Sequence, residues 1–225
     1  MVGARRVAVI DPGPEGLEHV RALAEAVRDA DEVQVVLTHG HRDHAPAAFV
    51  LAEELGVDVW GPEGLAAVDR PLVQGDVLAT DEGDLVAIAT PGHARHHLAF
   101  HWPARRALFA GDLLLGRGAT TWVGEYSGCV ADYLSSLERI RALELDVIYP
   151  AHGPPLDDPL DAIDRYAGHR RERIQQVEEA LRDRPETGEG ELLEIVYSGG
   201  VPVAMREAAL LSIRALMEHL GYPRS

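Results

Sequence analysis

The feature that most constrains the fold of this sequence is the segment VQVVLTHGHRDHA, residues 33–45. Its apolar, β-branched beginning is typical of a buried strand, and the strand leads directly into three histidines and an aspartate. Histidines packed this closely repel one another when they are protonated, so packing alone gives no reason for the crowding. The segment therefore indicates side chains that hold a ligand at the end of a strand.

The segments around this cluster alternate between strands and helices. ARRVAVIDPG predicts a buried strand that ends at the turn Pro12–Gly13, and residues 15–30 place apolar side chains at helical spacing. Residues 42–55 predict a second helix, so that Asp43 and His44 would begin it, and VDVWG predicts the next strand. This alternation is typical of α/β layering and not of an all-β barrel.

The remainder divides near residue 160. The segments DLVAIATPG, HLAFHW, RRALFAGD and DVIYPAHG predict short strands, with an amphipathic helix over residues 132–143. From Pro159 a charged helix is expected to run to about Arg184, and GELLEIVY and VAMREAALLSIRALMEHLG predict two shorter helices. We therefore expect a catalytic domain over residues 1–160 and a helical module over residues 161–225.

Further His and Asp residues also follow predicted strands: His93 in TPGH, Asp112 in AGD and His152 in PAHG. Residues just past strand ends converge on one rim of a layered α/β fold, where sites are built. A catalytic zinc takes about three protein ligands, and two metals roughly 3.5–4 Å apart can share a hydroxide. The expected ligands are His39, His41 and His93 for one ion, and Asp43, His44 and His152 for the other, with Asp112 bridging both.

The motifs THGHRDH, TPGHARHH, AGD and PAHGP, in this order and spacing, resemble those of the metallo-β-lactamase superfamily. The resemblance covers about residues 5–160 and implies an αββα sandwich with a binuclear metal centre that hydrolyses its substrate. Zinc penicillinases usually place Cys, or no bridging carboxylate, where Asp112 stands, so β-lactamase activity is not expected. His41 is present where iron-binding relatives carry an acid, which favours zinc over iron; the expected cofactor is two zinc ions, with iron and manganese as the open alternatives.

The C-terminal third carries a looser resemblance. IDPGPEGLEHV, DYLSSLERI and RYAGHRRERIQQVEEAL are similar to the β-lactamase-like group that includes a mitochondrial single-strand endoribonuclease. LLEIVY and MREAALLSIRALMEHLG are similar to the small winged-helix-like module of that group. The group normally has a strand pair before the IDPG strand, so we expect either that an upstream start codon is missed or that the sheet lacks two edge strands.

Three functions remain open from the sequence. The first is an endoribonuclease-like phosphodiesterase that cleaves single-stranded RNA, and the second is a thioesterase or small-ester hydrolase like hydroxyacylglutathione hydrolase (glyoxalase II), which shares TPGH. The third is a nucleic-acid-binding module on a non-catalytic core. The net charge of −16 favours a small substrate, whereas the C-terminal resemblance favours RNA. In either hydrolase Asp43 is expected to orient the nucleophile or to pass a proton to the leaving group.

Supporting roles are expected for a second set of residues. These candidates are Thr38, Asp11, His97, His169 and Arg170. Thr38, Asp11 and His97 are expected either to orient the metal ligands or to serve only the fold. His169 and Arg170, with Arg173, are expected to bind a phosphate or carboxylate group, against the alternative that the arginines of this helix pair with neighbouring glutamates at i,i+4.

The sequence also bears on the compartment. Its longest apolar runs fall short of the roughly 18–20 residues that a membrane-spanning helix needs, and the N-terminus lacks the apolar core of a secretory signal. The single cysteine, Cys129, excludes an internal disulfide. We therefore expect a cytoplasmic protein with no membrane partner, while the oligomeric state stays open.

Overall fold

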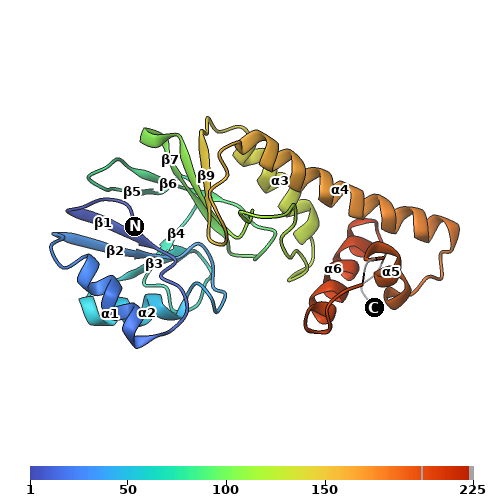
Figure 1. Ribbon diagram of the computed structural model, residues 1–225, viewed down its shortest axis with the longest axis horizontal. Coiled ribbons are helices and arrows are strands. Elements are labelled where there is room, and N and C mark those ends of the chain that lie inside the picture. The colour runs from blue at the N-terminus through green and yellow to red at the C-terminus, as the bar shows by residue number, and fades with distance from the viewer. Residues whose placement is uncertain (199, 223–225) are drawn as a thin grey trace.

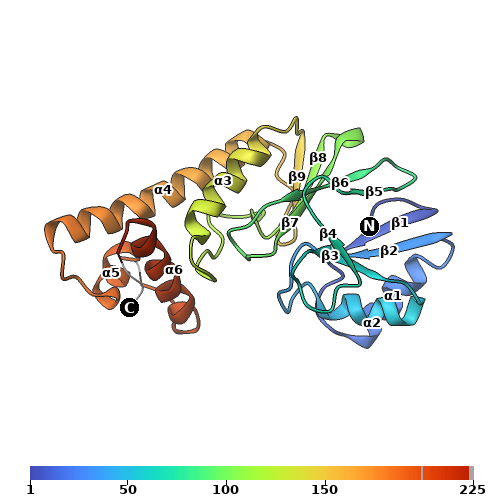
Figure 2. The ribbon, with the colours of Figure 1, turned by 180° about the vertical axis from the view of Figure 1, so that it is seen from behind.

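A computed structural model describes residues 1–198 and 200–222. Two β-sheets lie face to face, with helices on the outer face of each sheet (Figures 1 and 2). The apolar residues form three clusters, one under each helical layer and one between the sheets. The αββα sandwich expected from the sequence is therefore confirmed.

The first sheet is parallel, and its strand order follows the chain. The order is β1 (Arg6–Ile10), β2 (Glu32–Val36), β3 (Val59–Pro62) and β4 (Arg70–Leu72). Helices α1 (Leu17–Ala26) and α2 (Pro46–Leu55) cover its outer face. Because side chains alternate along a strand, Val7 and Val9 pack under these helices while Ala8 faces the second sheet.

The second sheet is mixed: its strands pair antiparallel except for the last two, which are parallel. The strands are β5 (Val77–Leu78), β6 (Leu85–Ala89), β7 (Leu98–Trp102), β8 (Ala107–Gly111) and β9 (Val147–Pro150). Helix α3 (Cys129–Arg141) and the first half of α4 (Pro159–Asp183) cover this sheet, and a 3₁₀ turn, Pro103–Arg105, joins β7 to β8. A Cβ atom at Gly92 would lie 2.5 Å from the Tyr133 Cα, so glycine lets the loop after β6 approach α3.

One predicted boundary is wrong and bears on the site. Helix α2 begins at Pro46, not at Arg42. Asp43 and His44 instead lie in a turn that the His44 and Ala45 amides close by donating to the His41 carbonyl. The physical reason is Pro46, whose missing N–H and fixed φ suit the first position of a helix but not its interior.

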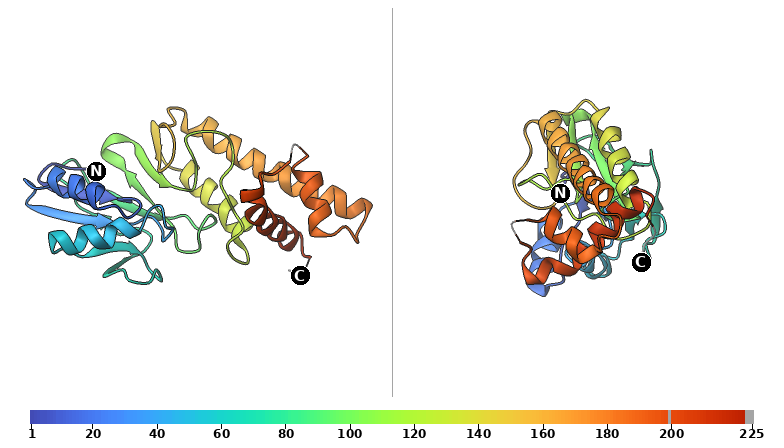
Figure 3. Two further views of the ribbon diagram at one scale, coloured as in Figure 1. Left: turned by 60° about the horizontal axis from the view of Figure 1, so that its bottom comes forward. Right: turned by 90° about the vertical axis from the view of Figure 1, so that its right-hand side faces the viewer.

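Helix α4 extends past the sandwich and carries two further helices at its far end (Figures 1 and 3). These are α5 (Glu189–Val196) and α6 (Arg206–His219), with a 3₁₀ turn at Val203–Met205. Their apolar faces join the same cluster as α3 and the second sheet. The C-terminal helices are therefore present, and the described residues 161–198 and 200–222 form no strand. The division into a separate helical module from residue 161 and its winged-helix likeness stay predictions.

Two further expectations concern the N-terminus and the membrane. β1 lies at the edge of its sheet, with an isolated bridge between Val2 and Ala8, and the absence of two preceding strands stays a prediction. Within the described residues, none of the helices is both long and apolar enough to cross a bilayer. The cytoplasmic location stays a prediction.

Candidate metal centre

The structure gathers all seven predicted ligands in two adjacent groups. One group is His39, His41 and His93, and the other is Asp43, His44, Asp112 and His152. Within each group the donor atoms lie within 4.8 Å of one another. His39 Nε2, His44 Nε2 and Asp112 Oδ1 are buried and have no hydrogen-bond partner in the described part of the chain. Buried polar atoms left in this state indicate a missing partner, and a cation satisfies all three.

A carboxylate from the end of β1 orients two of these imidazoles. Asp11 Oδ2 accepts hydrogen bonds from the Thr38 hydroxyl at 2.5 Å and from His44 Nδ1 at 2.9 Å. Because the Thr38 hydroxyl donates to Asp11, its oxygen accepts from His39 Nδ1 at 3.0 Å. Both histidines therefore hold their hydrogen on Nδ1 and present the Nε2 lone pair to the cluster, as metal-binding histidines do.

His93 and His41 meet across the first group. His93 Nδ1 donates to the Trp122 carbonyl at 2.9 Å, which leaves its Nε2 as an acceptor 2.9 Å from His41 Nδ1. On its other side His41 Nε2 lies 3.5 Å from Glu125 Oε1, so that the hydrogen of His41 faces the carboxylate. Two nitrogen lone pairs then point at one another, and this arrangement needs a cation or a shared proton.

His97 is not a ligand in this geometry. Its Nδ1 lies 2.8 Å from the Thr90 hydroxyl, and its Nε2 accepts from the Asp112 backbone N–H at 3.3 Å. Both ring nitrogens of His97 thus form hydrogen bonds with groups other than the metal-binding atoms. His97 supports the backbone that carries Asp112, which agrees with the supporting role expected for it.

Burial sets the protonation of the cluster. Burial lowers the pKa of His39, His93 and His97, to about 3 for His97. Burial also lowers the pKa of His44, but hydrogen bonding to Asp11 and the nearby Asp112 outweigh it and raise that pKa to about 10. The Asp112 pKa is lowered, because His44 and His93 together outweigh the effect of its burial. Neutral imidazoles and an ionised carboxylate are the forms that bind metal, and a metal would replace the proton of His44.

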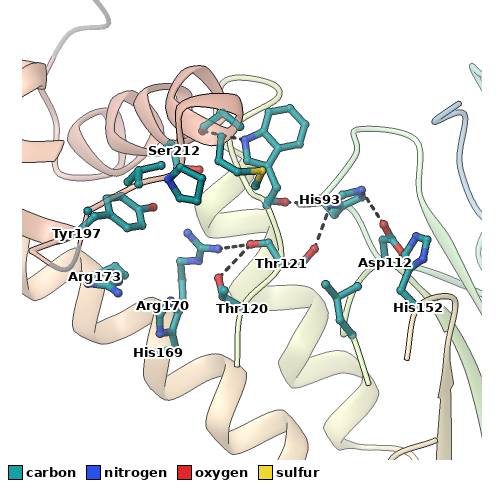
Figure 4. Close-up of a pocket in the computed structure, with 18 of the residues that line it drawn as sticks. His93, Asp112, Thr120, Thr121, His152, His169, Arg170, Arg173, Tyr197 and Ser212 are labelled. Carbon is teal, nitrogen blue, oxygen red and sulfur yellow. Dashed lines mark hydrogen bonds and ion pairs between the residues drawn. The ribbon is translucent and has the colours of Figure 1, made fainter. Parts of the chain in front are cut away.

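A cavity of about 600 Å³ adjoins the second group (Figure 4). His93, Asp112 and His152 line one end, with Asp43 Oδ2 3.1 Å from His152 Nε2, and His169, Arg170 and Arg173 from α4 line the other. Thr120 and Thr121 lie between the two ends, and the rest of the lining, from the loop after β8 and the segment before α6, is largely apolar. Its apolar lining residues include Leu115, Trp122, Val201, Pro202 and Met205. His169 and Arg170 therefore face the cavity, as expected.

Sequence reasoning missed two residues at this site, Glu125 and Trp122. Glu125 and Trp122 lie in the long loop between β8 and α3, where no hydrophobic period or motif indicates a role. Glu125 Oε2 accepts from the Arg95 backbone N–H at 2.8 Å, and Trp122 Nε1 donates to the Ala208 carbonyl at 3.0 Å. Arg173, which the sequence groups with His169 and Arg170, lines the same cavity.

Comparison with known proteins agrees with this geometry. Residues 1–68 and 63–152 match the family model of the metallo-β-lactamase superfamily. The chain is 29% identical to a "Beta-lactamase-like protein 2 homolog" of Caenorhabditis elegans, over 97% of this chain and 75% of that protein. It is 33% identical to the lactamase-like protein aptB of Emericella nidulans, over 84% of this chain and 62% of that protein.

Two further similarities bear on substrate and fold. An "Atrochrysone carboxyl ACP thioesterase" of Aspergillus fumigatus is 30% identical over 66% of this chain, which spans 47% of that protein. A metallo-β-lactamase family protein of Thermus thermophilus superposes with a TM-score of 0.80 at 23% identity, covering 97% of this chain and 86% of that one. This second likeness concerns the fold alone.

Proposed function

The chain belongs to the metallo-β-lactamase superfamily, and on this premise we propose that it hydrolyses a thioester or ester of a small, partly apolar substrate at two zinc ions. The superfamily and the His/Asp cluster make the chain a metal-dependent hydrolase by class. The number of ions, the identity of the metal and the substrate are the parts that we propose.

The donor set supports two zinc ions. Imidazole nitrogens and carboxylate oxygens, three or four to a group, are ligands that zinc accepts in catalytic sites. Asp112 lies within 3.6 Å of His44 Nε2 and of His93 Nε2, one residue from each group, so its carboxylate can contact both ions. When bound, such a pair supplies Lewis acidity and a hydroxide nucleophile at neutral pH.

Asp43 is the residue we assign to proton transfer. Its side chain is 56% exposed and lines the cavity, and its Oδ2 lies 3.1 Å from His152 Nε2. A carboxylate at the boundary between the cluster and the cavity can orient the nucleophile and pass a proton to the leaving sulfur or oxygen. Asp11, Thr38, His97 and Glu125 hold the ligands without reaching the substrate.

The observation that carries the proposal is the cavity of about 600 Å³ that opens on Asp43, Asp112 and His152. Its volume lies within the range of small-molecule pockets, and much of its lining is apolar. The net charge of −16 opposes the approach of a nucleic-acid backbone. The Aspergillus fumigatus relative whose name includes "thioesterase" adds support for a thioester.

Cleavage of single-stranded RNA is the second candidate, and one observation favours it. Arg170 and Arg173 bring two guanidinium groups to the cavity wall, and guanidinium groups fit phosphate well. The two candidates differ in what fills the middle of the cavity, which is an acyl chain in one and a nucleotide in the other.

The test is a parallel assay of the zinc-loaded full chain. Chromogenic acyl thioesters and labelled single-stranded RNA are incubated with wild type and with Asp112→Ala, at low and moderate salt. We expect thioester hydrolysis by wild type, loss of hydrolysis in Asp112→Ala, and intact RNA. RNA cleavage that Asp112→Ala abolishes, with inert thioesters, would establish the second candidate instead.

A further inference from the structure

Two arginines of α4 form a cationic wall at the end of the cavity away from the metal cluster. Arg170 is 4% exposed, and Arg173 is half-buried. The Nε atoms of both are buried and have no hydrogen-bond partner in residues 1–198 and 200–222. Neither side chain forms an ion pair with a carboxylate of these residues, although acids outnumber bases in the chain, 37 to 21.

The partners that these arginines do have are neutral. Arg170 Nη2 donates to the Thr121 carbonyl at 3.0 Å, and its guanidinium lies 5.3 Å from the centre of the Tyr133 ring. Arg173 Nη1 donates to Gln176 Oε1 at 2.8 Å and to a backbone carbonyl, and its guanidinium lies 5.1 Å from the Tyr197 ring. Carbonyls and rings orient a guanidinium, but they do not neutralise its charge.

Arg171, which follows Arg170 on the helix, shows how a surface arginine is neutralised in this protein. Arg171 is not among the residues that line the cavity, is exposed, and pairs with Glu138 of α3 at 3.1 Å. An ion pair thus neutralises Arg171, although its partner lies on α3 and not at i,i+4 on the same helix, and no such pair neutralises Arg170 or Arg173 within residues 1–198 and 200–222. A buried cation without an anion is costly, because burial removes its water and supplies no opposite charge in return.

The position of these arginines relates them to the reaction site. Figure 4 shows Arg170, Arg173, His169 and Tyr197 at one end of the cavity and His93, Asp112 and His152 at the other. An anion bound at the arginine end would therefore lie in the same cavity as the metal cluster, but away from it. The lining of the cavity also includes apolar side chains, among them Val201, Pro202 and Met205, which suit a hydrocarbon part of the substrate.

We propose that Arg170 and Arg173 bind an anionic group, a carboxylate or phosphate, carried by the substrate at the end opposite its scissile bond. This rests on the proposed function, and it defines the substrate class as an acyl ester or thioester with an apolar middle and a remote negative charge. The buried guanidinium groups then gain the anion that the protein itself does not provide.

Binding can be measured without turnover. Octanoate, octyl phosphate and octanol are titrated into the zinc-loaded full chain by calorimetry, so that three probes share one chain length and differ in the head group. We expect both anions to bind at least about tenfold more tightly than octanol, the loss expected for one charge-assisted hydrogen bond. The anion that binds more tightly, octanoate or octyl phosphate, shows whether the natural group is a carboxylate or a phosphate.

Variants locate the anion. Arg173→Gln is expected to lower the affinity for octanoate about tenfold and to leave the affinity for octanol unchanged. Arg173→Lys, which keeps the charge, is expected to recover much of the lost affinity for octanoate. Arg171→Gln changes the net charge equally on the outer face of the same helix and is expected to bind like wild type. Arg170→Met serves as a second variant, and melting curves check that each variant is folded.

Two results would overturn this assignment. One is equal affinity for octanoate and octanol, and the other is an octanoate affinity that Arg173→Gln lowers no more than Arg171→Gln, as binding at the metal cluster would give. Failure of the proposed function gives a different result, in which the anions bind as expected but thioesters are not hydrolysed.

Discussion

The substitution Asp11→Asn tests how the metal ligands are held. Asparagine tolerates the left-handed backbone of this position, φ 43°, about as well as aspartate does, so the change adds no backbone strain. Its Oδ1 can still accept from the Thr38 backbone N–H, a bond of 2.7 Å in the wild type. In place of Oδ2 it carries an NH₂ group, which donates where the wild type accepts.

The consequence falls on His44. Facing an NH₂ donor 2.9 Å away, His44 Nδ1 must become an acceptor, which moves the ring hydrogen to Nε2. Nε2 is the atom that lies 3.6 Å from Asp112 and is expected to bind the metal. Loss of a residue that orients a ligand typically lowers metal affinity about 10–100-fold, or about 1.4–2.8 kcal/mol. This range is close to the value of one hydrogen bond to a charged group, about 1.5–3 kcal/mol. The bond that orients the metal ligand is the one from His44 Nδ1.

The assay is competition for zinc between the protein and a chelator of known affinity. We expect the weaker-binding ion of Asp11→Asn to be lost at a chelator concentration about 10–100-fold lower than for wild type. Asp81→Asn is the matched control, because Asp81 also accepts several hydrogen bonds, from the backbone N–H groups of Ala4, Arg5 and Arg6, but is exposed. Equal zinc retention by Asp11→Asn and Asp81→Asn would refute the reasoning.

Three further outcomes follow from the same geometry. Glu125→Gln should lower zinc affinity less than Asp11→Asn does in the same competition assay, because the contact of Glu125 with His41 is long, 3.5 Å. Asp112→Asn should reduce the zinc content below that of wild type in elemental analysis, because it removes the charge that both ligand groups face. Leu108→Ala should lower the free energy of unfolding in urea by about 2–5 kcal/mol, because Leu108 is fully buried between the second sheet and its helices, and zinc stoichiometry should survive in the folded fraction.

Most of the candidate metal ligands could be predicted from the sequence because each of them stands in a local pattern. His39, His93, Asp112 and His152 each follow a strand within four residues, and strand ends converge by topology, whatever the side-chain packing. The sandwich followed for the same reason, since the alternation in β1 that sends Val9 to one face and Ala8 to the other is visible in the sequence.

The rest depends on contacts between distant segments. Glu125 reaches His41 across 84 positions of the chain, through a loop with no periodicity, and no local pattern encodes that approach. The roles of the α4 arginines depend on which face of the helix meets the cavity. Arg170 and Arg171 are neighbours in the sequence, but Arg170 is buried, whereas Arg171 is exposed and pairs with Glu138. The start of α2 was misplaced because helical spacing was extended backwards through Pro46.

Anomalous X-ray diffraction at the zinc absorption edge, on crystals of the zinc-loaded chain, tests the central claim most directly. We expect two anomalous peaks, one among His39, His41 and His93 and the other among Asp43, His44, Asp112 and His152. A single peak, or peaks away from these side chains, would contradict the binuclear centre.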